Sequence, residues 1–350
     1  MLQIKKISIP GYEHVIEGID QEANLHCFIA IHSTELGPAL GGVRIFPYTN
    51  DKEALADVLR LAKAMTVKSA LADLPLGGGK SVIIADPKRE KNRVLLSKFA
   101  EVVESLKGDY IVAEDVGSTV ADMLILREKT SHVVALPTEY SSGDPSPFTA
   151  FGIIKGIESV LKHLFGNSTF EGITVAIQGI GNVGKELAEQ LFWKGAHLIL
   201  ADIDREKAVS IAKKYGGEVV SPDIIHTVKC DIFSPCAMGG IVNSRTIREM
   251  SCKAIAGSAN NQLECVEDDR LLFDKKILYA PDFVINAGGL INVSTEFDGY
   301  DPRQSLKKIN NIFNVLSLIL LRSKKEGRGT ESIALELAKE NLDLARLKST

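Results

Sequence analysis

Two lysines and one aspartate stand in settings where their side chains could do acid–base chemistry. Lys80 directly follows three glycines and precedes the apolar run Val82-Ile83-Ile84, where partial burial favours the neutral amine that a general base needs. Lys68, twelve positions earlier, could serve as a fixed cation for a carboxylate. Asp115 follows an expected strand, where α/β domains often place active-site carboxylates. Each residue also has a structural alternative. Lys80 could be a surface lysine at a strand edge, and Lys68 could stabilise the C-terminus of a helix. Asp115 could cap a helix, although Ser118 is the better cap.

A glycine-rich turn (GIGNVG) follows an expected strand and opens an expected helix. Its amides can face a pyrophosphate at the positive end of that helix, while the missing side chains permit close approach. Asp202 ends the next strand, where its carboxylate would accept hydrogen bonds from ribose hydroxyls and repel a 2′-phosphate. The acid at this position therefore favours NAD over NADP. The structural alternative is a strand-to-helix turn in which the glycines are needed for packing alone. The candidate residues of the turn are Gly179, Gly181, Asn182, Val183 and Gly184.

The elements that would position the two lysines and Asp115 alternate between strand and helix. A helix is expected from Asp51, because Asn50 can cap it and Glu53 stands three residues on. This helix delivers Lys68 at its end. After a turn at LPLGGG, β-rich runs follow at 81–85 and 110–113. The alternation predicts an α/β domain.

A second domain is expected after the Ser-, Pro- and Gly-rich stretch 141–152, which is typical of a hinge. A helix (153–164), a strand (173–178), another helix and a strand (197–201) then give the βαβ pattern of a Rossmann-type nucleotide-binding domain. Asp301 and Pro302 are expected to open a helix that continues to Leu320, and a final helical segment starts near Thr330.

Composition excludes several classes of partner. The 350 residues carry a formal net charge of -4, so no overall basic field attracts nucleic acid or an anionic membrane. The five cysteines show no close ligand spacing, so neither a disulfide framework nor a metal site is expected and a reducing compartment fits best. With no signal-peptide pattern and no apolar run of about 20 residues, a cytoplasmic location is expected.

Six blocks in order resemble the leucine, valine and phenylalanine dehydrogenases of the glutamate dehydrogenase superfamily. The resemblance covers residues 25–300 and is more specific than any single motif. The blocks are GPALGGVR (37–44), LAKAMTVKSALADLPLGGGKSVI (61–83), AEDVGS (113–118), GIGNVG (179–184), AGSANNQL (256–263) and NAGGLINV (286–293).

The resemblance implies a role for each chemical residue. Lys68 would bind the substrate α-carboxylate, Lys80 would act as general base through a water, and Asp115 would assist proton transfer to and from nitrogen. The reaction would be reversible oxidative deamination of an L-amino acid by NAD, giving a 2-oxo acid and ammonia without a metal. Positions that match cofactor or substrate contacts are Thr149, Ala237, Asn260, where many relatives carry Asp, and Asn261.

Substrate choice follows from the side-chain pocket that the resemblance implies. The glutamate enzymes place a lysine before the two glycines of the first block, whereas this chain has Leu40 followed by Gly41. Ala113, Leu290 and Val293 also match pocket positions, so a glutamate carboxylate would be unpaired. A branched aliphatic substrate is the first expectation, and an aromatic one such as phenylalanine is the alternative.

The resemblance also implies a homo-oligomer and a two-domain architecture with the active-site cleft between the domains. Residues 1–145, completed by a C-terminal helix at about 328–350, would form the substrate and assembly domain, and 146–327 the NAD-binding domain. Two alternatives stay open. One is a shikimate-type dehydrogenase, which also pairs lysine with aspartate but needs no ammonia, and the other is a noncatalytic NAD-binding regulator.

Overall fold

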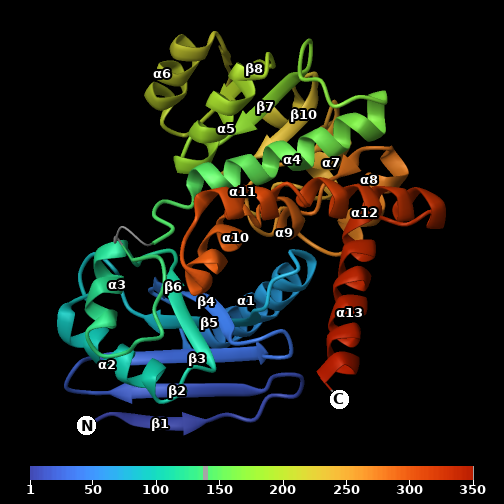
Figure 1. The fold of residues 1–350 in the computed structure, drawn as a ribbon. Helices are drawn as coiled ribbons and strands as arrows, with labels where there is room; N and C mark the ends of the chain where they lie inside the picture. Colours follow the sequence, from blue (N-terminus) through green and yellow to red (C-terminus); the bar gives the residue numbers. More distant parts are fainter. Residues whose placement is uncertain (137–140, 350) are drawn as a thin grey trace. The chain divides into compact units, whose positions relative to one another are not determined.

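The computed structural model describes residues 1–136 and 141–349, which form two compact units (Figure 1). Unit 1 comprises Met1–Gly143, Val293–Tyr300 and Ala338–Thr350, and unit 2 comprises Asp144–Asn292 and Asp301–Leu337. The assignment of residues 293–300 to unit 1 differs from the division expected from the sequence. Residue 350 of the expected final helix lies outside the described residues.

Unit 1 is built on a mixed six-stranded sheet in the order β1-β2-β3-β5-β4-β6. The pairs β1–β2, β2–β3 and β3–β5 are antiparallel, whereas β4 is parallel to both β5 and β6. The carboxyl ends of β4 and β6 therefore lie at one edge of the sheet. The strands are β1 (Gln3–Lys6), β2 (His14–Asp20), β3 (Leu25–Ser33), β4 (Ala39–Phe46), β5 (Gly77–Ile84) and β6 (Tyr110–Glu114).

Helices cover both faces of this sheet. Helix α1 (Asp51–Leu71) packs on the face that carries Phe28 and Ala30, while α2 (Arg93–Glu104) and α3 (Val120–Arg127) pack on the face that carries Cys27 and Ile29. Because successive side chains of a strand point to opposite faces, β3 is apolar along almost its whole length. The α/β fold class predicted from the sequence is confirmed.

Local signals predicted some element boundaries of unit 1 and missed others. Helix α1 begins at Asp51 as expected, because the Asn50 side chain accepts a hydrogen bond from the amide of Glu53. Two expectations were wrong. The three glycines before Lys80 lie inside β5 rather than in a turn, and Thr119 rather than Ser118 caps α3 through a capping box with Asp122.

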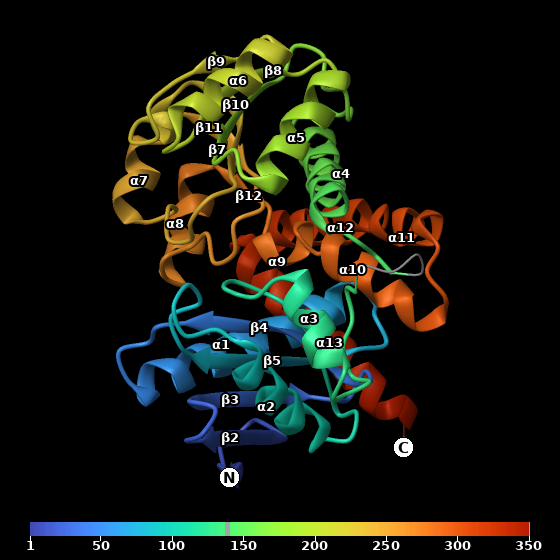
Figure 2. The ribbon, with the colours of Figure 1, turned by 90° about the vertical axis from the view of Figure 1, so that its left-hand side faces the viewer.

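Unit 2 contains a second six-stranded sheet, in which every pair of neighbours is parallel (Figure 2). The order β12-β11-β10-β7-β8-β9 is that of a Rossmann fold, with β7 and β10 at the point where the chain switches direction across the sheet. The strands are β7 (Thr174–Gln178), β8 (His197–Ala201), β9 (Glu218–Val219), β10 (Cys230–Pro235), β11 (Cys252–Ile255) and β12 (Leu278–Tyr279).

Helices flank this sheet on both sides, and α4 and α5 lie on the opposite side from α7 and α8 in Figure 2. Two expectations needed correction. Helix α4 begins at Ser146, inside the stretch read as a hinge, and the helix opened by Asp301 ends at Ile309 before a new one starts at Ile312. The helices are α4 (Ser146–Phe165), α5 (Asn182–Trp193), α6 (Arg205–Tyr215), α7 (Ser244–Glu249), α8 (Glu267–Lys275), α9 (Asp282–Ile285), α10 (Gly288–Ser294), α11 (Pro302–Ile309), α12 (Ile312–Glu326) and α13 (Thr330–Ser349).

Within the described ranges, no helix combines the length and the apolar character that a membrane span requires.

Candidate active site

Lys80 lies in the middle of β5 and forms an ion pair with Asp115. Its backbone pairs with Ala30 of β3, and only 9% of its side chain is exposed. The Nζ atom lies 2.7 Å from Oδ2 of Asp115. The structure therefore rules out the strand-edge surface lysine that the sequence left open, and it joins two of the residues singled out for chemistry.

The Asp115 carboxylate stands in a turn that is fixed to the neighbouring strand. The Ser118 hydroxyl accepts a hydrogen bond from the Asp115 amide at 2.8 Å and donates to the Val43 carbonyl of β4 at 2.9 Å. Burial alone would raise the pKa of Asp115, but the Lys80 ammonium and the Arg44 guanidinium outweigh it and hold that pKa below its usual range. The group is thus a carboxylate at neutral pH.

Arg44 is a site residue that the sequence reasoning missed. Its Nε lies 3.3 Å from Oδ2 of Asp115, and its Nη1 lies 2.9 Å from Oδ2 of Asp57 in α1. The Tyr48 hydroxyl donates to the same Asp57 oxygen at 2.7 Å. The available signal was the arginine that ends GPALGGVR, but the sequence contains nothing that pairs it with a residue 71 positions later.

Glycines bring the elements that carry the two lysines close together. A Cβ on Gly78 of β5 would lie 2.1 Å from the backbone nitrogen of Thr66 in α1, and one on Gly41 of β4 would lie 1.8 Å from the Gly79 carbonyl oxygen. Both contacts are far below any tolerated distance. Lys68, half-buried in the last turn of α1, stands two residues beyond Thr66, so the close packing of α1 on β5 sets its position.

The expected side-chain pocket residues of unit 1 lie on neighbouring strands. Leu40 is 1% exposed and pairs with Gly78 of β5 and Ile111 of β6, while half-buried Ala113 pairs with Gly42. Val293 is buried and also belongs to unit 1, whereas half-buried Leu290 belongs to unit 2. The predicted pocket residues of unit 1 are thus apolar, and position 40 carries no charged side chain.

In unit 2 the glycine-rich turn joins β7 to α5 at the switch point of the sheet. Gly179 has a φ of 97°, and a Cβ on Gly184 would lie 2.0 Å from the Gly179 carbonyl oxygen. Gly181 has no neighbouring atom within 4 Å of an added Cβ, and α5 begins at the next residue, Asn182. Packing thus explains two of the glycines. The open side at Gly181, beside the amides that begin α5, fits a dinucleotide pyrophosphate.

Asp202 fastens this turn to the end of β8. Its Oδ2 accepts a hydrogen bond from the amide of Ile180 at 2.6 Å, and its Oδ1 accepts one from the amide of Asp204 at 2.8 Å. Each carboxylate oxygen keeps a further lone pair for a ribose hydroxyl. The structure therefore gives Asp202 a structural function, and the ribose contact expected from the sequence stays a prediction.

The other cofactor candidates of unit 2 lie on the loops after β10 and β11 and on helix α4. Exposed Ala237 directly follows Cys236, whose amide donates to the Gln178 carbonyl at the end of β7. Thr149 lies in the first turn of α4, where a Cβ on Gly289 would be 2.7 Å from its Oγ1. Exposed Asn260 and Asn261 stand side by side, and the latter has a φ of 52°.

Asn286 was missed by the sequence reasoning, although it begins the block NAGGLINV. Its Nδ2 donates to Oδ1 of Asn260 at 2.8 Å and to the Ser258 carbonyl at 3.1 Å. Its own Oδ1 is buried without a hydrogen-bond partner in the described part of the chain. Asn286 thereby fixes the orientation of the Asn260 side chain.

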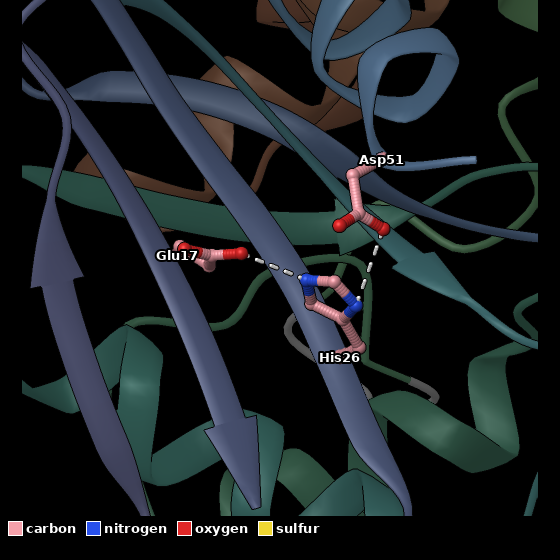
Figure 3. Close-up of side chains that lie close together, drawn as sticks. All are labelled: Glu17, His26 and Asp51. Carbon is pink, nitrogen blue, oxygen red and sulfur yellow. Dashed lines mark hydrogen bonds and ion pairs between the residues drawn. The ribbon is translucent and has the colours of Figure 1, made fainter.

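A separate group of side chains in unit 1, Glu17, His26 and Asp51, has the composition of a metal site (Figure 3). However, Nε2 of His26 lies 2.9 Å from Glu17 and Nδ1 lies 3.6 Å from Asp51, so the imidazole lies between the two carboxylates. A metal ion would need both carboxylates and one ring nitrogen directed at the same point. The group is instead a polar link between β2, β3 and the start of α1.

The parallel sheet and glycine turn of unit 2, with the lysine–aspartate pair of unit 1, define a dehydrogenase with a nicotinamide dinucleotide site. Two family models match the chain: "Glu/Leu/Phe/Val dehydrogenase, dimerisation domain" at residues 15–132 and "Glutamate/Leucine/Phenylalanine/Valine dehydrogenase" at residues 200–308. The chain belongs to this family. The resemblance read from the six sequence blocks is confirmed.

Similar proteins cover almost the whole chain. The leucine dehydrogenase of Geobacillus stearothermophilus is 45% identical over 96% of this chain and 92% of its own length. The phenylalanine dehydrogenase of Lysinibacillus sphaericus is 45% identical over 88% of this chain and 82% of its own. The crystal structure of L-tryptophan dehydrogenase from Nostoc punctiforme matches with a TM-score of 0.85 and 40% identity, covering 96% of this chain and 97% of the other.

Proposed function

We propose that this protein catalyses the NAD-dependent, reversible oxidative deamination of an apolar L-amino acid, with leucine, valine or isoleucine as first choice. The observation that carries the proposal is the ion pair between Lys80 and Asp115, which withdraws a potential base and its partner carboxylate from solvent. Surface ion pairs do not require such burial, whereas a site that must move protons away from bulk water does.

Each of the three chemical residues has a proposed task. Lys68 binds the α-carboxylate of the substrate as a fixed cation. A bound NAD would supply the acceptor for the hydride that leaves the substrate α-carbon. Lys80 then removes a proton from the water that adds to the resulting imine carbon, and Asp115 passes protons to and from the nitrogen that leaves as ammonia. No step requires a metal ion.

The apolar residues of unit 1 support an apolar substrate. A glutamate side chain placed beside Leu40 would leave its carboxylate unpaired among apolar groups, a desolvation penalty of about 1–3 kcal/mol or more. The proposed pocket residues are Leu40, Gly41, Ala113, Leu290 and Val293, with Asn261 on the loop after β11. The Nostoc and Lysinibacillus relatives act on aromatic amino acids by name, so an aromatic substrate is the second candidate.

The end of β8 supports NAD as the preferred dinucleotide. The Asp202 carboxylate is half-buried and fixed by two backbone amides, so it has little freedom to turn away from a 2′-phosphate. Like charges at hydrogen-bonding distance disfavour NADP. The proposed cofactor residues are Gly179, Gly181, Asn182, Val183, Gly184 and Asp202 for the pyrophosphate and ribose, and Thr149, Ala237 and Asn260 for the nicotinamide end.

The proposal includes a homo-oligomer in the cytoplasm. The family model matched by residues 15–132 is described as a dimerisation domain, and all five cysteines are free thiols, as is usual in a reducing compartment. Light scattering coupled to size exclusion measures the assembly directly.

The test is NADH oxidation by the purified protein with ammonia and a panel of 2-oxo acids: 4-methyl-2-oxopentanoate, 3-methyl-2-oxobutanoate, phenylpyruvate and 2-oxoglutarate. An apolar oxo acid should react only when ammonia is present, and Lys80→Ala should lower turnover by about 100- to 10,000-fold. Lys63→Ala, which removes an exposed lysine of α1, is the control. A preference for 2-oxoglutarate would refute the pocket argument, turnover without ammonia would favour the shikimate-type reading, and no turnover with any acid would favour the regulator.

A further inference from the structure

Arg44 and Lys80 share one oxygen of Asp115, which makes their functions interdependent. Oδ2 of Asp115 lies 2.7 Å from the Lys80 ammonium and 3.3 Å from Nε of Arg44. A general base has to give up its proton in part of the cycle, whereas a guanidinium stays charged at every working pH. Asp115 therefore keeps one permanent cationic partner when Lys80 becomes neutral.

We propose that Arg44, held by Asp57 and Tyr48, is a positioning residue that keeps the Asp115 carboxylate oriented toward Lys80 and favours its ionised form between proton transfers. This inference rests on the proposed function, because it takes Lys80 as the base and Asp115 as its partner. It adds three residues of β4, the following loop and α1 to the machinery.

The far side of Arg44 shows how its guanidinium is held. Nη1 donates to Oδ2 of Asp57, which also accepts the Tyr48 hydroxyl, while Arg60 donates to the other Asp57 oxygen at 2.7 Å. Asp57 is 16% exposed and Arg44 21% exposed, so this chain of contacts lies mostly out of solvent. A lysine at position 44 has a single charged centre and could not contact Asp57 and Asp115 with separate nitrogens.

Charges around the network agree with this arrangement. Burial lowers the pKa of Arg44, but Asp115 and Asp57 outweigh it and the net shift is upward. Burial and the Asp57 carboxylate raise the pKa of Tyr48, which keeps its hydroxyl as a donor. Burial, with a smaller contribution from the Asp115 charge, also raises the pKa of Tyr110, and its hydroxyl donates to the Gly41 carbonyl. Lys80 and Arg44 are thus the cations that control Asp115.

The geometry predicts that substitutions of Arg44 and of its partner Asp57 shift the pH dependence of deamination in opposite directions. Arg44→Met removes a cation that repels the Lys80 ammonium and leaves Asp115 entirely to Lys80, so the base gives up its proton less readily. The acid limb of the deamination kcat/KM profile should then move to higher pH by about one unit, with kcat lowered about 10- to 100-fold and the KM of the amino acid changed less than about threefold. Asp57→Asn removes an anion but keeps an oxygen acceptor for Nη1, so it should move the same limb slightly to lower pH.

The experiment measures these pH profiles on the oligomeric wild-type enzyme and on Arg44→Met, Arg44→Lys and Asp57→Asn. Compared with Arg44→Met, Arg44→Lys should recover part of kcat and bring the acid limb part of the way back to its wild-type pH, because lysine restores the charge but not the second contact. Arg93→Met removes an exposed arginine at the start of α2 that pairs with Glu128, the residue after α3, and is the matched control. Tyr48→Phe, which deletes one hydroxyl, should shift the acid limb in the same direction as Arg44→Met but by a smaller amount. It replaces Arg44→Met in the test if that variant does not fold.

Each outcome decides the inference separately from the proposed function. If the wild type deaminates an apolar amino acid and Lys80→Ala abolishes this, but the limb is the same in Arg44→Met, Tyr48→Phe and the control, Arg44 contributes only to folding and the inference is wrong. Shifts of the same sign in Arg44→Met and Asp57→Asn would also overturn it, because an electrostatic role requires opposite signs. If the wild type shows no turnover, the proposed function itself has failed.

Discussion

At the scale of single residues, the chemistry of Asp115 depends on neighbours that are distant in the sequence. The carboxylate lies beside Lys80 and Arg44, and the two cations more than offset the rise in pKa that burial would cause. Because the pKa of Asp115 is lower in the folded protein than in the unfolded chain, its stabilising contribution is present above the unfolded value near 3.8 and is lost as the pH falls through the folded value.

Replacing Asp115 by asparagine should therefore affect both turnover and stability. Asp115→Asn leaves the buried Lys80 ammonium without its anion, and we expect about 1–3 kcal/mol of destabilisation at neutral pH and a loss of kcat of about 100-fold or more. Urea unfolding at several pH values measures the first effect, and the difference from wild type should shrink below about pH 4. A constant difference across that range would show that the carboxylate charge is not the stabilising feature.

Asp202 allows a second prediction at this scale, about the dinucleotide. Asp202→Asn removes the charge that repels a 2′-phosphate but keeps one oxygen for the amide of Ile180 or Asp204. The ratio of kcat/KM for NADP to that for NAD should rise about tenfold or more, which corresponds to about 1.4 kcal/mol. Steady-state kinetics with both dinucleotides measure the ratio. An unchanged ratio would mean that the carboxylate serves only to hold the glycine turn.

The sequence identified Lys68, Lys80 and Asp115 but not Arg44 or Asp57, for a physical reason. A lysine after a glycine run or an acid after a strand carries a local signal, since the neighbouring residues set its environment. Whether two side chains meet depends on strand order and register. Here β4 lies between β5 and β6, which brings Arg44 to the Asp115 turn. A single sequence contains no direct record of that order.

At the scale of elements, close contact between α1 and β5 is the feature that positions both lysines. The glycine run before Lys80 predicts a turn, because glycines usually interrupt strands. In the structure Gly78 is glycine because Thr66 of α1 occupies the space of a side chain. The expectation for α1 was correct because its signal, the Asn50 cap, is local. The break between α11 and α12 was missed because apolar spacing continues across it.

Gly78→Ala should accordingly separate α1 from β5. An added Cβ would lie 2.1 Å from backbone nitrogen, which cannot move without shifting the helix, so we expect a loss of about 3 kcal/mol or more of stability. In the folded fraction the KM of the amino acid should rise, because Lys68 moves with α1. Gly78 is not among the glycines with a positive φ, so the contact with Thr66 is the expected cause. Gly166→Ala, where φ is 79° but an added Cβ meets nothing within 4 Å, is the comparison and should cost less despite its backbone strain. Equal stability of the two variants would contradict the packing argument.

At the scale of the whole molecule, the chain returns to unit 1 twice after it has entered unit 2. Residues 293–300 and 338–350 belong to unit 1, and the Asn341 side chain of α13 donates to the Ala70 carbonyl in the last turn of α1. The other end of α13 starts in unit 2, where Asp269 accepts hydrogen bonds from the amides of Glu331 and Ser332. Periodicity predicted a helix from Thr330, but no local pattern shows which unit a helix completes.

The start of α13 also makes the stability of the molecule depend on pH. Burial, followed by the Asp282 and Asp269 carboxylates, raises the pKa of Glu331 from 4.5 to about 8. Its buried Oε2 has no hydrogen-bond partner in the described residues. Between these two values the folded protein holds a proton that the unfolded chain releases, so the stability contributed by this group falls as the pH rises from about 4.5 to about 8 and is constant above that.

Glu331→Gln cannot ionise, so it should be more stable than the wild type on the alkaline side. We expect a gain of about 1–3 kcal/mol in the free energy of unfolding at about pH 9 and almost no gain at about pH 5. The gain at about pH 9 is smaller than the free energy that corresponds to the whole pKa shift of Glu331, because the surrounding residues relax. Urea unfolding at the two pH values gives the difference, and Glu206→Gln, an exposed position in α6, is the matched control. Deamination releases a proton and is therefore favoured at alkaline pH. The gain in stability would thus occur in the pH range in which deamination is favoured. Parallel curves for wild type and Glu331→Gln across this range would show that Glu331 ionises in the folded protein as readily as in the unfolded chain.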